Sequence, residues 1–276
     1  MDSPHDAAPP GMSTTPRLVH PPLVLALGGH DPSGAGIQAD IEATARFGCH
    51  ALTLVTCLTA QNTGRVEEVI PVQPYLLRRQ FDLIVTDTRP IAACKIGLLP
   101  SVDVLMMVCD LVRELPPGVP VVVDPVIAAG SGASLTSDGV RRAMLEHLWP
   151  LATLRTPNAR EARLLAAASG LRSLDDVLDR GAGWTLVKGA DEPTVDVDHR
   201  LFRGGRLYAS YRWPRLIGSF HGSGCTLGSA IAALMARGET LPLAVAQALD
   251  FTWHSVADAL DIGGIQYLPN RHTRQA

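Results

Sequence analysis

Apolar runs and amphipathic stretches alternate along almost the whole chain. Short runs rich in Val, Leu and Ile are typical of buried strands, whereas apolar residues that recur every three or four positions indicate helices. The pattern predicts strands over residues 22–28, 52–57, 66–72, 91–96, 121–123, 153–156, 184–188, 195–203 and 206–212. It predicts helices over residues 36–47, 74–86, 102–114, 138–147, 161–168, 224–236 and 242–260. Such alternation is typical of an α/β fold with a mainly parallel sheet and helices on both faces.

The same pattern indicates a single domain, because no linker, repeat or low-complexity segment interrupts it. We expect this domain over residues 21–268, followed by a C-terminal tail of residues 269–276. Residues 1–20 are rich in Pro, Ser and Thr, and we expect them to form a disordered N-terminal extension in which Met1 and Met12 are alternative starts. The extension lacks the charged segment and apolar run of a signal peptide.

Composition narrows the classes of function. The formal net charge is −3 and no basic cluster occurs, which argues against nucleic acid as the main partner. No segment approaches the roughly 20 apolar residues of a membrane-spanning helix. The five cysteines are scattered without C-x-x-C spacing, which is typical of free thiols in a reducing compartment. We therefore expect a cytoplasmic protein that binds neither nucleic acid nor membrane.

Polar residues and glycines gather directly after the predicted strands. In a parallel sheet the carboxyl ends of the strands meet at one edge, where α/β proteins bind their ligands. The segments that fall there are residues 28–36, 61–63, 95–97, 124–125, 158–161, 188–189 and 221–225. The sequence therefore predicts one pocket at this edge.

The segment His221-Gly222-Ser223-Gly224-Cys225 is the most informative of these. A glycine-rich turn that leads into a helix directs backbone N–H groups at one point, at the positive end of the helix dipole, and such a turn binds anions. A helix N-terminus also lowers the pKa of a thiol, so we expect Cys225 to be partly thiolate near neutral pH. Cys225 would then act as a nucleophile with His221, or as the base that removes a proton from a hydroxyl. The alternative is a glycine turn that only caps a buried helix.

Carboxylates and a lysine follow further strands. Asp124 ends an all-valine strand, and Lys188 ends another and is long enough to reach a phosphate. Asn158 and Glu161 have the spacing of a helix capping box, and they are also suited to organise Mg²⁺ and its waters beside a triphosphate. The segment 28–40 follows the first strand but has neither the G-x-G-x-x-G nor the P-loop pattern. Asp40, at its end, could hydrogen-bond a polar ring substituent.

Together these segments resemble the hydroxymethylpyrimidine/phosphomethylpyrimidine kinases of thiamine biosynthesis, within the ribokinase-like superfamily. The resemblance runs from about residue 22 to 236 and rests on G-G-H-D-P-S-G and G-I-Q-A-D within 28–40, L-T-A-Q-N-T at 58–63, K-I-G-L-L at 95–99, V-D-P-V at 123–126, T-P-N-x-x-E-A at 156–162, V-K-G at 187–189 and H-G-S-G-C-T-L at 221–227. The last motif is the most specific, because most of the superfamily has Asp where this family and this chain have Cys225.

The resemblance implies a ribokinase-like three-layer α/β/α sandwich and a role for individual residues. Gly222, Ser223, Gly224 and Cys225 would form the catalytic anion hole and base. The pyrimidine would be bound by Gly28, Asp40, Gln61, Leu98 and Val126, ATP by Asp124, Asn158, Lys188 and Thr226, and Mg²⁺ by Glu161 and Asp124 through water. The implied reaction is phosphorylation by ATP of 4-amino-5-hydroxymethyl-2-methylpyrimidine and then of its monophosphate, in a homodimeric enzyme.

The chain departs from the family pattern at a few positions. Residues 33–36 are one glycine shorter than the family's S-G-G-A-G, Leu98 replaces a usual Met, and residues 129–133 lack the Lys and Asp of A-K-S-G-D. Because a lysine would offset the repulsion between two phosphates, we expect the second phosphorylation to be slower than the first. The alternative functions are a pyridoxal kinase, a weakly catalytic vitamin-binding or regulatory protein, and a Cys–His hydrolase. The hydrolase leaves Asp40, Asn158 and Glu161 unexplained.

Overall fold

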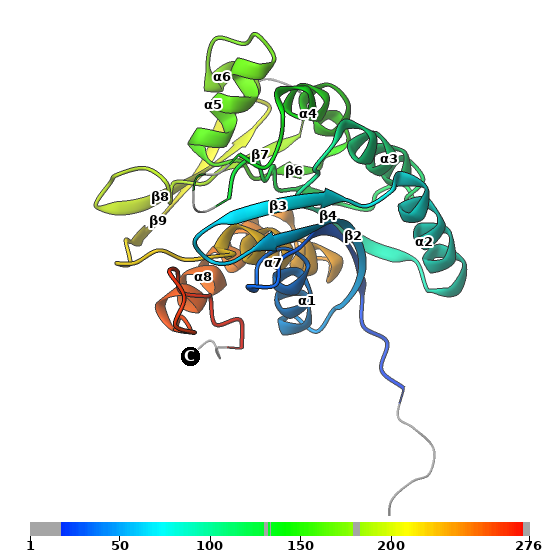
Figure 1. The fold of residues 1–276 in the computed structure, drawn as a ribbon. Coiled ribbons are helices and arrows are strands. Elements are labelled where there is room, and N and C mark those ends of the chain that lie inside the picture. Colours follow the sequence, from blue (N-terminus) through cyan, green and yellow to red (C-terminus); the bar gives the residue numbers. More distant parts are fainter. Residues whose placement is uncertain (1–17, 130–131, 133, 179–182, 273–276) are drawn as a thin grey trace, which may run out of the picture.

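The computed structural model describes residues 18–129, 132, 134–178 and 183–272 (Figure 1). Nine strands of this part of the chain form one sheet in the order β3-β2-β1-β4-β5-β6-β7-β8-β9. They are β1 (Leu23–His30), β2 (His50–Gln61), β3 (Val66–Pro71), β4 (Ile91–Ile96), β5 (Val121–Val123), β6 (Leu154–Arg155), β7 (Trp184–Val187), β8 (Asp196–Arg203) and β9 (Arg206–Pro214). The central strands pair in parallel in the order β2-β1-β4-β5-β6-β7. At the edges, β3 is antiparallel to β2, β8 to β7 and β9 to β8. The mainly parallel sheet expected from the sequence is confirmed.

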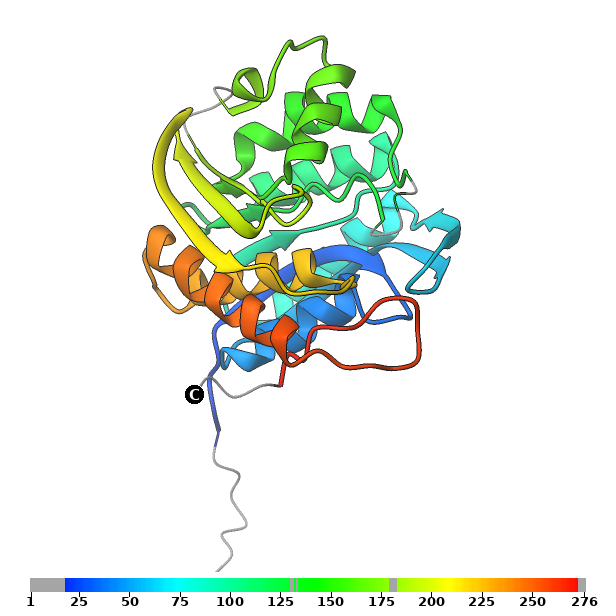
Figure 2. The same ribbon diagram turned by 90° about the vertical axis from the view of Figure 1, so that its left-hand side faces the viewer.

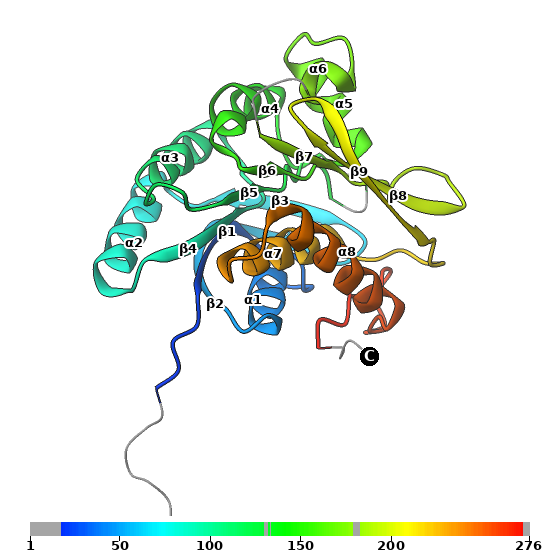
Figure 3. The same ribbon diagram turned by 180° about the vertical axis from the view of Figure 1, so that it is seen from behind.

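Helices cover both faces of this sheet (Figures 1 and 3). One face carries α1 (Gly36–Arg46), α7 (Ser223–Ala236) and α8 (Leu241–Ala257), and the other carries α2 (Pro74–Asp87), α3 (Val102–Arg113), α4 (Asp138–Ala143), α5 (Ala159–Ala168) and α6 (Leu174–Leu178). Side chains of β1 alternate between the two cores: Leu25 and Leu27 pack with α2 and α3, and Val24 packs with α7 and α8. The fold is therefore the three-layer α/β/α sandwich. None of the described helices is long and apolar enough to cross a membrane.

Three elements differ from the prediction for physical reasons. Strand β2 extends beyond the predicted 52–57, because its polar end continues as the hairpin partner of β3. The helix predicted over 138–147 is α4 followed by a π-helical turn over Met144–Leu148. Helix α6 was not predicted, because a helix of five residues is too short to show a helical repeat of apolar positions.

The segment after α8 folds back onto the N-terminal part of the domain (Figure 2). Arg271 is only 3% exposed, and it donates from Nε to Thr226 Oγ1 at 2.8 Å. Its two terminal nitrogens donate to Glu42 Oε2 and to the Gly34 carbonyl, both at 2.9 Å. Arg271 thereby joins α7, α1 and the loop between β1 and α1.

Several sequence expectations fall outside the described residues. Of the expected tail, residues 269–271 are packed on the domain, His272 is exposed, and 273–276 lie outside the description. The same holds for residues 1–17 of the expected N-terminal extension, with Met1 and Met12. In the loop of residues 129–133, Gly130, Ser131 and Ala133 also lie outside it. These expectations stay predictions.

Candidate active site

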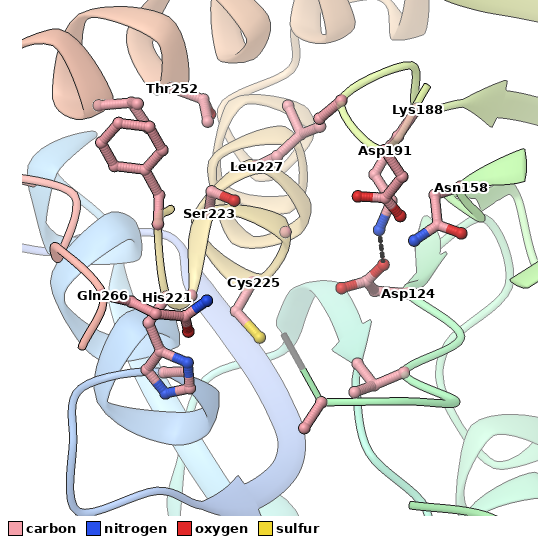
Figure 4. A pocket seen from close by; sticks show the side chains of 18 of the residues that line it. Asp124, Asn158, Lys188, Asp191, His221, Ser223, Cys225, Leu227, Thr252 and Gln266 are labelled. Atoms are coloured by element: carbon pink, nitrogen blue, oxygen red, sulfur yellow. Dashed lines mark hydrogen bonds and ion pairs between the residues drawn. The ribbon is translucent and has the colours of Figure 1, made fainter. Parts of the chain in front are cut away.

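The carboxyl ends of the parallel strands border a cavity of about 610 Å³ (Figure 4). This volume is within the usual range of small-molecule sites. The residues expected in the site that line this cavity are Gly28, Gln61, Leu98, Asp124, Val126, Asn158, Glu161, Lys188, Gly222, Ser223, Gly224 and Cys225. Asp40 and Thr226 do not line it. The fold thus brings the glycine-rich turn, the lysine and the two carboxylates together at the edge where the sequence placed a pocket.

The turn of residues 222–225, called the anion turn below, presents backbone to the cavity. Gly222 has a φ of 86°, which glycine adopts readily, and a Cβ there would lie 2.9 Å from a nitrogen of Arg271. Because α7 begins at Ser223, its first N–H groups have no partner inside the helix. A Cβ on Gly224 would lie 3.4 Å from Lys188 Nζ, so this backbone faces an ammonium group. Free N–H groups opposite a lysine are suited to bind a phosphate.

Cys225 lies on the cavity wall, at the third position of α7 (Figure 4). Burial raises the pKa of its thiol above the ordinary value, and the Lys95 ammonium and the Gly36 N–H only partly offset this. The expectation of a thiolate near neutral pH is therefore wrong. Loss of water around the sulfur is the largest cause, and the nearby carboxylates of Asp40 and Asp124 also raise this pKa.

His221 is held by an aspartate. Its Nε2 lies 2.6 Å from Asp31 Oδ2, and both side chains are buried. Among the described residues, no hydrogen bond joins the His221 ring to Cys225. A nucleophilic cysteine needs such a partner, so the geometry gives the hydrolase alternative no support.

Lys188 lies between two carboxylates on the cavity wall. Its Nζ is 2.7 Å from Asp124 Oδ1 and 3.7 Å from Glu161 Oε2. Burial acts to raise the pKa of Asp124, but the ammonium groups of Lys188 and Lys95 outweigh it and hold that pKa below its ordinary value. Burial raises the pKa of Glu161 to about 7, despite the neighbouring Lys188. The three groups therefore form one coupled charge cluster that faces the cavity.

Both bonds of the predicted capping box are present at the start of α5. The Asn158 side chain accepts from the Glu161 N–H at 2.7 Å, and Glu161 Oε2 accepts from the Asn158 N–H at 2.8 Å. Both residues also line the cavity, so the cap does not exclude a second role. Among the described residues, no group of three or more His, Cys, Asp or Glu could hold a metal ion. Asp124 and Glu161 are oxygen donors that fit a Mg²⁺ bound mainly through waters and phosphates.

Comparisons with known proteins agree with this geometry. A family model described as phosphomethylpyrimidine kinase matches residues 31–270. The chain belongs to the phosphomethylpyrimidine kinase family. It is 39% identical over 252 residues to a protein of Mycobacterium tuberculosis named hydroxymethylpyrimidine/phosphomethylpyrimidine kinase, and the match covers 86% of each chain.

Solved structures extend the agreement to the fold. The phosphomethylpyrimidine kinase of Clostridium difficile matches this chain with a TM-score of 0.70 and 26% identity, over 84% of this chain and 98% of that chain. The pyridoxal kinase of Staphylococcus aureus, solved in complex with pyridoxal, matches with a TM-score of 0.80 and 23% identity, over 93% of this chain and 96% of that chain. The ribokinase-like fold expected from the sequence is confirmed.

In this member of the phosphomethylpyrimidine kinase family, Asp40 lies behind the cavity wall. It is fully buried, and its Oδ1 accepts from Lys95 Nζ and from Ser229 Oγ, each at 2.6 Å. Its Oδ2 has no hydrogen-bond partner within the described chain, and a Cβ on Gly28 would lie 3.3 Å from it. Burial raises the pKa of Asp40. Contact between Asp40 and a substrate ring stays a prediction.

Thr226 also lies behind the wall. Its hydroxyl donates to the Gly222 carbonyl at 2.8 Å and accepts from Arg271. These bonds support the anion turn from the rear. Contact between Thr226 and ATP stays a prediction.

The cavity also includes residues that the sequence analysis missed. His199 and Trp213 come from the β8–β9 hairpin, and their rings lie in edge contact. Burial lowers the pKa of His199 to about 4, so this ring is neutral at physiological pH. Alternation along the two strands of the hairpin could have indicated these residues. Ser219 and Gln266 had no such signal, because they lie in irregular segments of the chain.

Proposed function

We propose that this protein uses ATP to phosphorylate 4-amino-5-hydroxymethyl-2-methylpyrimidine, and then its monophosphate, in thiamine biosynthesis. The observation that carries the proposal is the anion turn, which faces Lys188 with Cys225 beside it in one cavity. Membership of the phosphomethylpyrimidine kinase family supports the substrate class. The five cysteines are all described and free, which supports a reducing, cytoplasmic location.

Phosphoryl transfer requires mainly positioning and charge stabilisation. The N–H groups of the anion turn would hold the oxygens of the transferred phosphoryl group as negative charge develops on them. Lys188 would add positive charge from the opposite wall, where its Nζ already lies near Gly224. Lys188 directly follows β7 and the anion turn leads into α7, so the sheet and the helix fix their separation.

Cys225 would take the proton of the substrate hydroxyl. A neutral thiol cannot do this, so the raised pKa of Cys225 requires the sulfur to lose its own proton to solvent first. Thiols are stronger acids than aliphatic alcohols, so the proton moves late, as the oxygen–phosphorus bond forms. The rate should therefore rise with pH through the titration of this thiol.

We further propose that Asp124 and Glu161 hold Mg²⁺ through water, on the side of the cavity where Lys188 lies. When bound, Mg²⁺ would neutralise charge on the phosphate oxygens of ATP. Asp124 is the better candidate for a permanently charged donor, since its pKa lies below the ordinary value. Glu161, with a pKa of about 7, would lose its proton more readily as a cation approaches.

Consumption of ATP tests this proposal, with a panel of acceptors that includes the pyrimidine alcohol, its monophosphate, pyridoxal and a thiazole alcohol. We expect the pyrimidine alcohol to give the highest kcat/KM and its monophosphate a lower one. Lys95 borders the cavity, but its Nζ is already paired with Asp40, so we do not expect it to replace the lysine missing from residues 129–133. A preference for pyridoxal would establish the pyridoxal kinase alternative, and turnover of no acceptor would favour a binding or regulatory protein.

We also propose that the protein is a homodimer, as the resemblance to its family implies. Sedimentation of the purified protein would test this. A single species of twice the chain's 29.4 kDa would support the proposal, and a species at 29.4 kDa would overturn it.

A further inference from the structure

Gln266 carries an unused hydrogen-bond acceptor on the cavity wall. The side chain is 7% exposed and lines the cavity (Figure 4). Its Nε2 donates to Ser219 Oγ at 2.6 Å, whereas its Oε1 has no hydrogen-bond partner among the described residues. A buried acceptor without a partner is costly, so such a group in a ligand cavity indicates a donor supplied by the ligand.

The backbone holds Gln266 in a fixed position between two parts of the site. Thr63, just beyond the end of β2, accepts from the N–H groups of Ile265 and Gln266 at 2.9 and 3.4 Å. The next residue, Tyr267, donates to the Ser219 carbonyl at 2.9 Å and accepts from the His221 N–H at 2.8 Å. Gln266 therefore lies between the β2–β3 hairpin, where Gln61 lines the cavity, and the approach to the anion turn.

The chemistry of the substrate then leaves one group for Gln266. On the proposed function, the hydroxymethyl oxygen must face the anion turn, where the phosphoryl group arrives. The two ring nitrogens of the pyrimidine are acceptors, and its methyl group is apolar. The exocyclic amino group is thus the remaining donor of the substrate, and a carboxamide oxygen is its natural acceptor.

We propose that Gln266 is a substrate-binding residue that determines specificity by accepting a hydrogen bond from the amino group of the pyrimidine. This inference rests on the proposed function and extends it. Beside its hydroxymethyl group pyridoxal carries an aldehyde, which has no hydrogen to donate, where the pyrimidine carries its amino group. Gln266 would therefore favour the aminopyrimidine over pyridoxal. A substrate without this donor would leave the buried Gln266 oxygen unpaired, and this cost would select against it. A purely apolar pocket cannot discriminate in this way.

Two pyrimidine alcohols and three proteins test the proposal. The substrates are the aminopyrimidine alcohol and the same alcohol without its amino group. The proteins are the wild type, Gln266→Met and Gln80→Met. Methionine preserves the length of the side chain without its polar atoms, and Gln80 is an exposed residue of α2 away from the cavity.

We expect the wild type to prefer the amino compound by about tenfold or more in KM, since a net hydrogen bond is worth about one factor of ten. Gln266→Met should lose that preference with little change in kcat, and Gln80→Met should keep it. If Gln266→Met retained the wild-type preference, or lowered the kcat/KM of both substrates equally, the proposal would be overturned. Gln266→Asn provides a second variant if the Met protein does not fold, and its shorter amide should weaken the preference.

Binding measurements separate this inference from the proposed function. If the wild type consumed no ATP with the aminopyrimidine alcohol, the proposed function would fail. Calorimetric titration of the same two alcohols into the same proteins would still test Gln266. A loss of preference between them in Gln266→Met would support its role in recognition, and equal affinities in the wild type would overturn it.

Discussion

Two lysine–aspartate pairs lie near the start of α7, and they differ in their exposure to the cavity. Lys95 and Asp40 are 2.6 Å apart, and both side chains are completely buried. Lys188 and Asp124 are 2.7 Å apart, but the Lys188 side chain is 12% exposed and Glu161 is 3.7 Å away. The first pair, called the closed pair below, has no exposed side-chain surface, although Lys95 borders the cavity. The second, called the open pair, is partly exposed in the cavity and shared with a third charge.

Two pairs of the same residue types can therefore have different roles, because they differ in burial. A closed pair must satisfy its own charges, because its side chains have no surface that water can reach. An open pair can exchange a partner for a phosphate or a cation without leaving a charge stranded. The Lys95 pair should therefore matter most for folding, and the Lys188 pair for turnover.

Lys95→Met should produce the largest loss of stability. The substitution leaves Asp40 in the interior without its cation, and removal of one partner of a buried pair costs about 3–5 kcal/mol. We expect a fall in Tm of roughly 6–20 °C, measured by thermal unfolding. The double variant Asp40→Asn with Lys95→Met should recover most of the loss, because it removes both charges. An unchanged Tm in the single variant would contradict the closed-pair interpretation.

Cys225→Ala should lower turnover by about 10²- to 10⁴-fold, the range for a lost acid–base group. Cys225→Asp should retain more activity than Ala. Its rate should begin to rise at lower pH, because a carboxyl loses its proton well below the raised pKa of the thiol. The pH dependence of kcat/KM checks both expectations. Cys109→Ala, which changes a thiol of α3, should leave the pH profile in place, and near-normal turnover of Cys225→Ala would exclude the base role.

Lys188→Met should lower kcat by about 10²- to 10³-fold, as expected when one preorganised charge is removed from a transition state. Its Tm should fall less than that of Lys95→Met, because cavity water can approach Asp124. Lys188→Arg should restore part of the activity by restoring the charge. If Lys188→Met lowered the Tm as much as Lys95→Met does and kept its kcat, the assignment of the Lys188 pair to turnover would be contradicted.

Glu161→Gln should change how stability depends on pH. The pKa of Glu161 is about 7 in the folded protein and 4.5 ordinarily, so the folded state binds this proton more tightly than the unfolded state. The wild type therefore loses stability from this group as pH rises from about 4.5 to about 7. Gln does not titrate, so the free energy of unfolding of the variant, relative to the wild type, should rise by about 2 kcal/mol from pH 5 to pH 7. Urea unfolding at both pH values measures this difference. The same pH dependence of stability in the variant and the wild type would refute the raised pKa of Glu161.

The same variant should need more magnesium. Gln also closes a capping box, so Glu161→Gln should preserve the start of α5 while it removes the carboxylate from the cavity. We expect the magnesium concentration for half-maximal activity to rise several-fold, by titration at fixed ATP, because a carboxylate favours Mg²⁺ more than an amide does. An unchanged titration would leave Glu161 with the cap alone.

The part of the site around the open pair and the anion turn could largely be predicted, because local sequence determines it. The spacing of Asn158 and Glu161 sets the capping box, and the glycines before α7 set the anion turn. Position after a strand placed Asp124 and Lys188 at the same edge. Each of these inferences needs only residues within a few positions of one another and the rule for parallel sheets.

Other features of the site depend on contacts between segments far apart in the sequence. Lys95, 55 positions away, and Ser229, 189 positions away, hold the Asp40 carboxylate behind Gly28, and its expected contact with a substrate stays a prediction. The pKa of Cys225 was expected to be lowered by the helix N-terminus, but burial by other segments raised it. Gln266 reaches the cavity from an irregular segment without a local pattern. The periodicity of the sequence carries no information on such long-range contacts.

The support that Arg271 gives to the anion turn depends on the order in which the chain is synthesised. The turn and α1 emerge from the ribosome before Arg271 does, yet the guanidinium that joins Thr226, Glu42 and the Gly34 carbonyl comes from near the end of the described chain. Until residue 271 has left the ribosome, none of these three bonds exists, even if β1, α1 and α7 have already been made. The nascent chain can build most of its sheet on the ribosome, but it completes the support behind its anion turn only after residue 271 has been added.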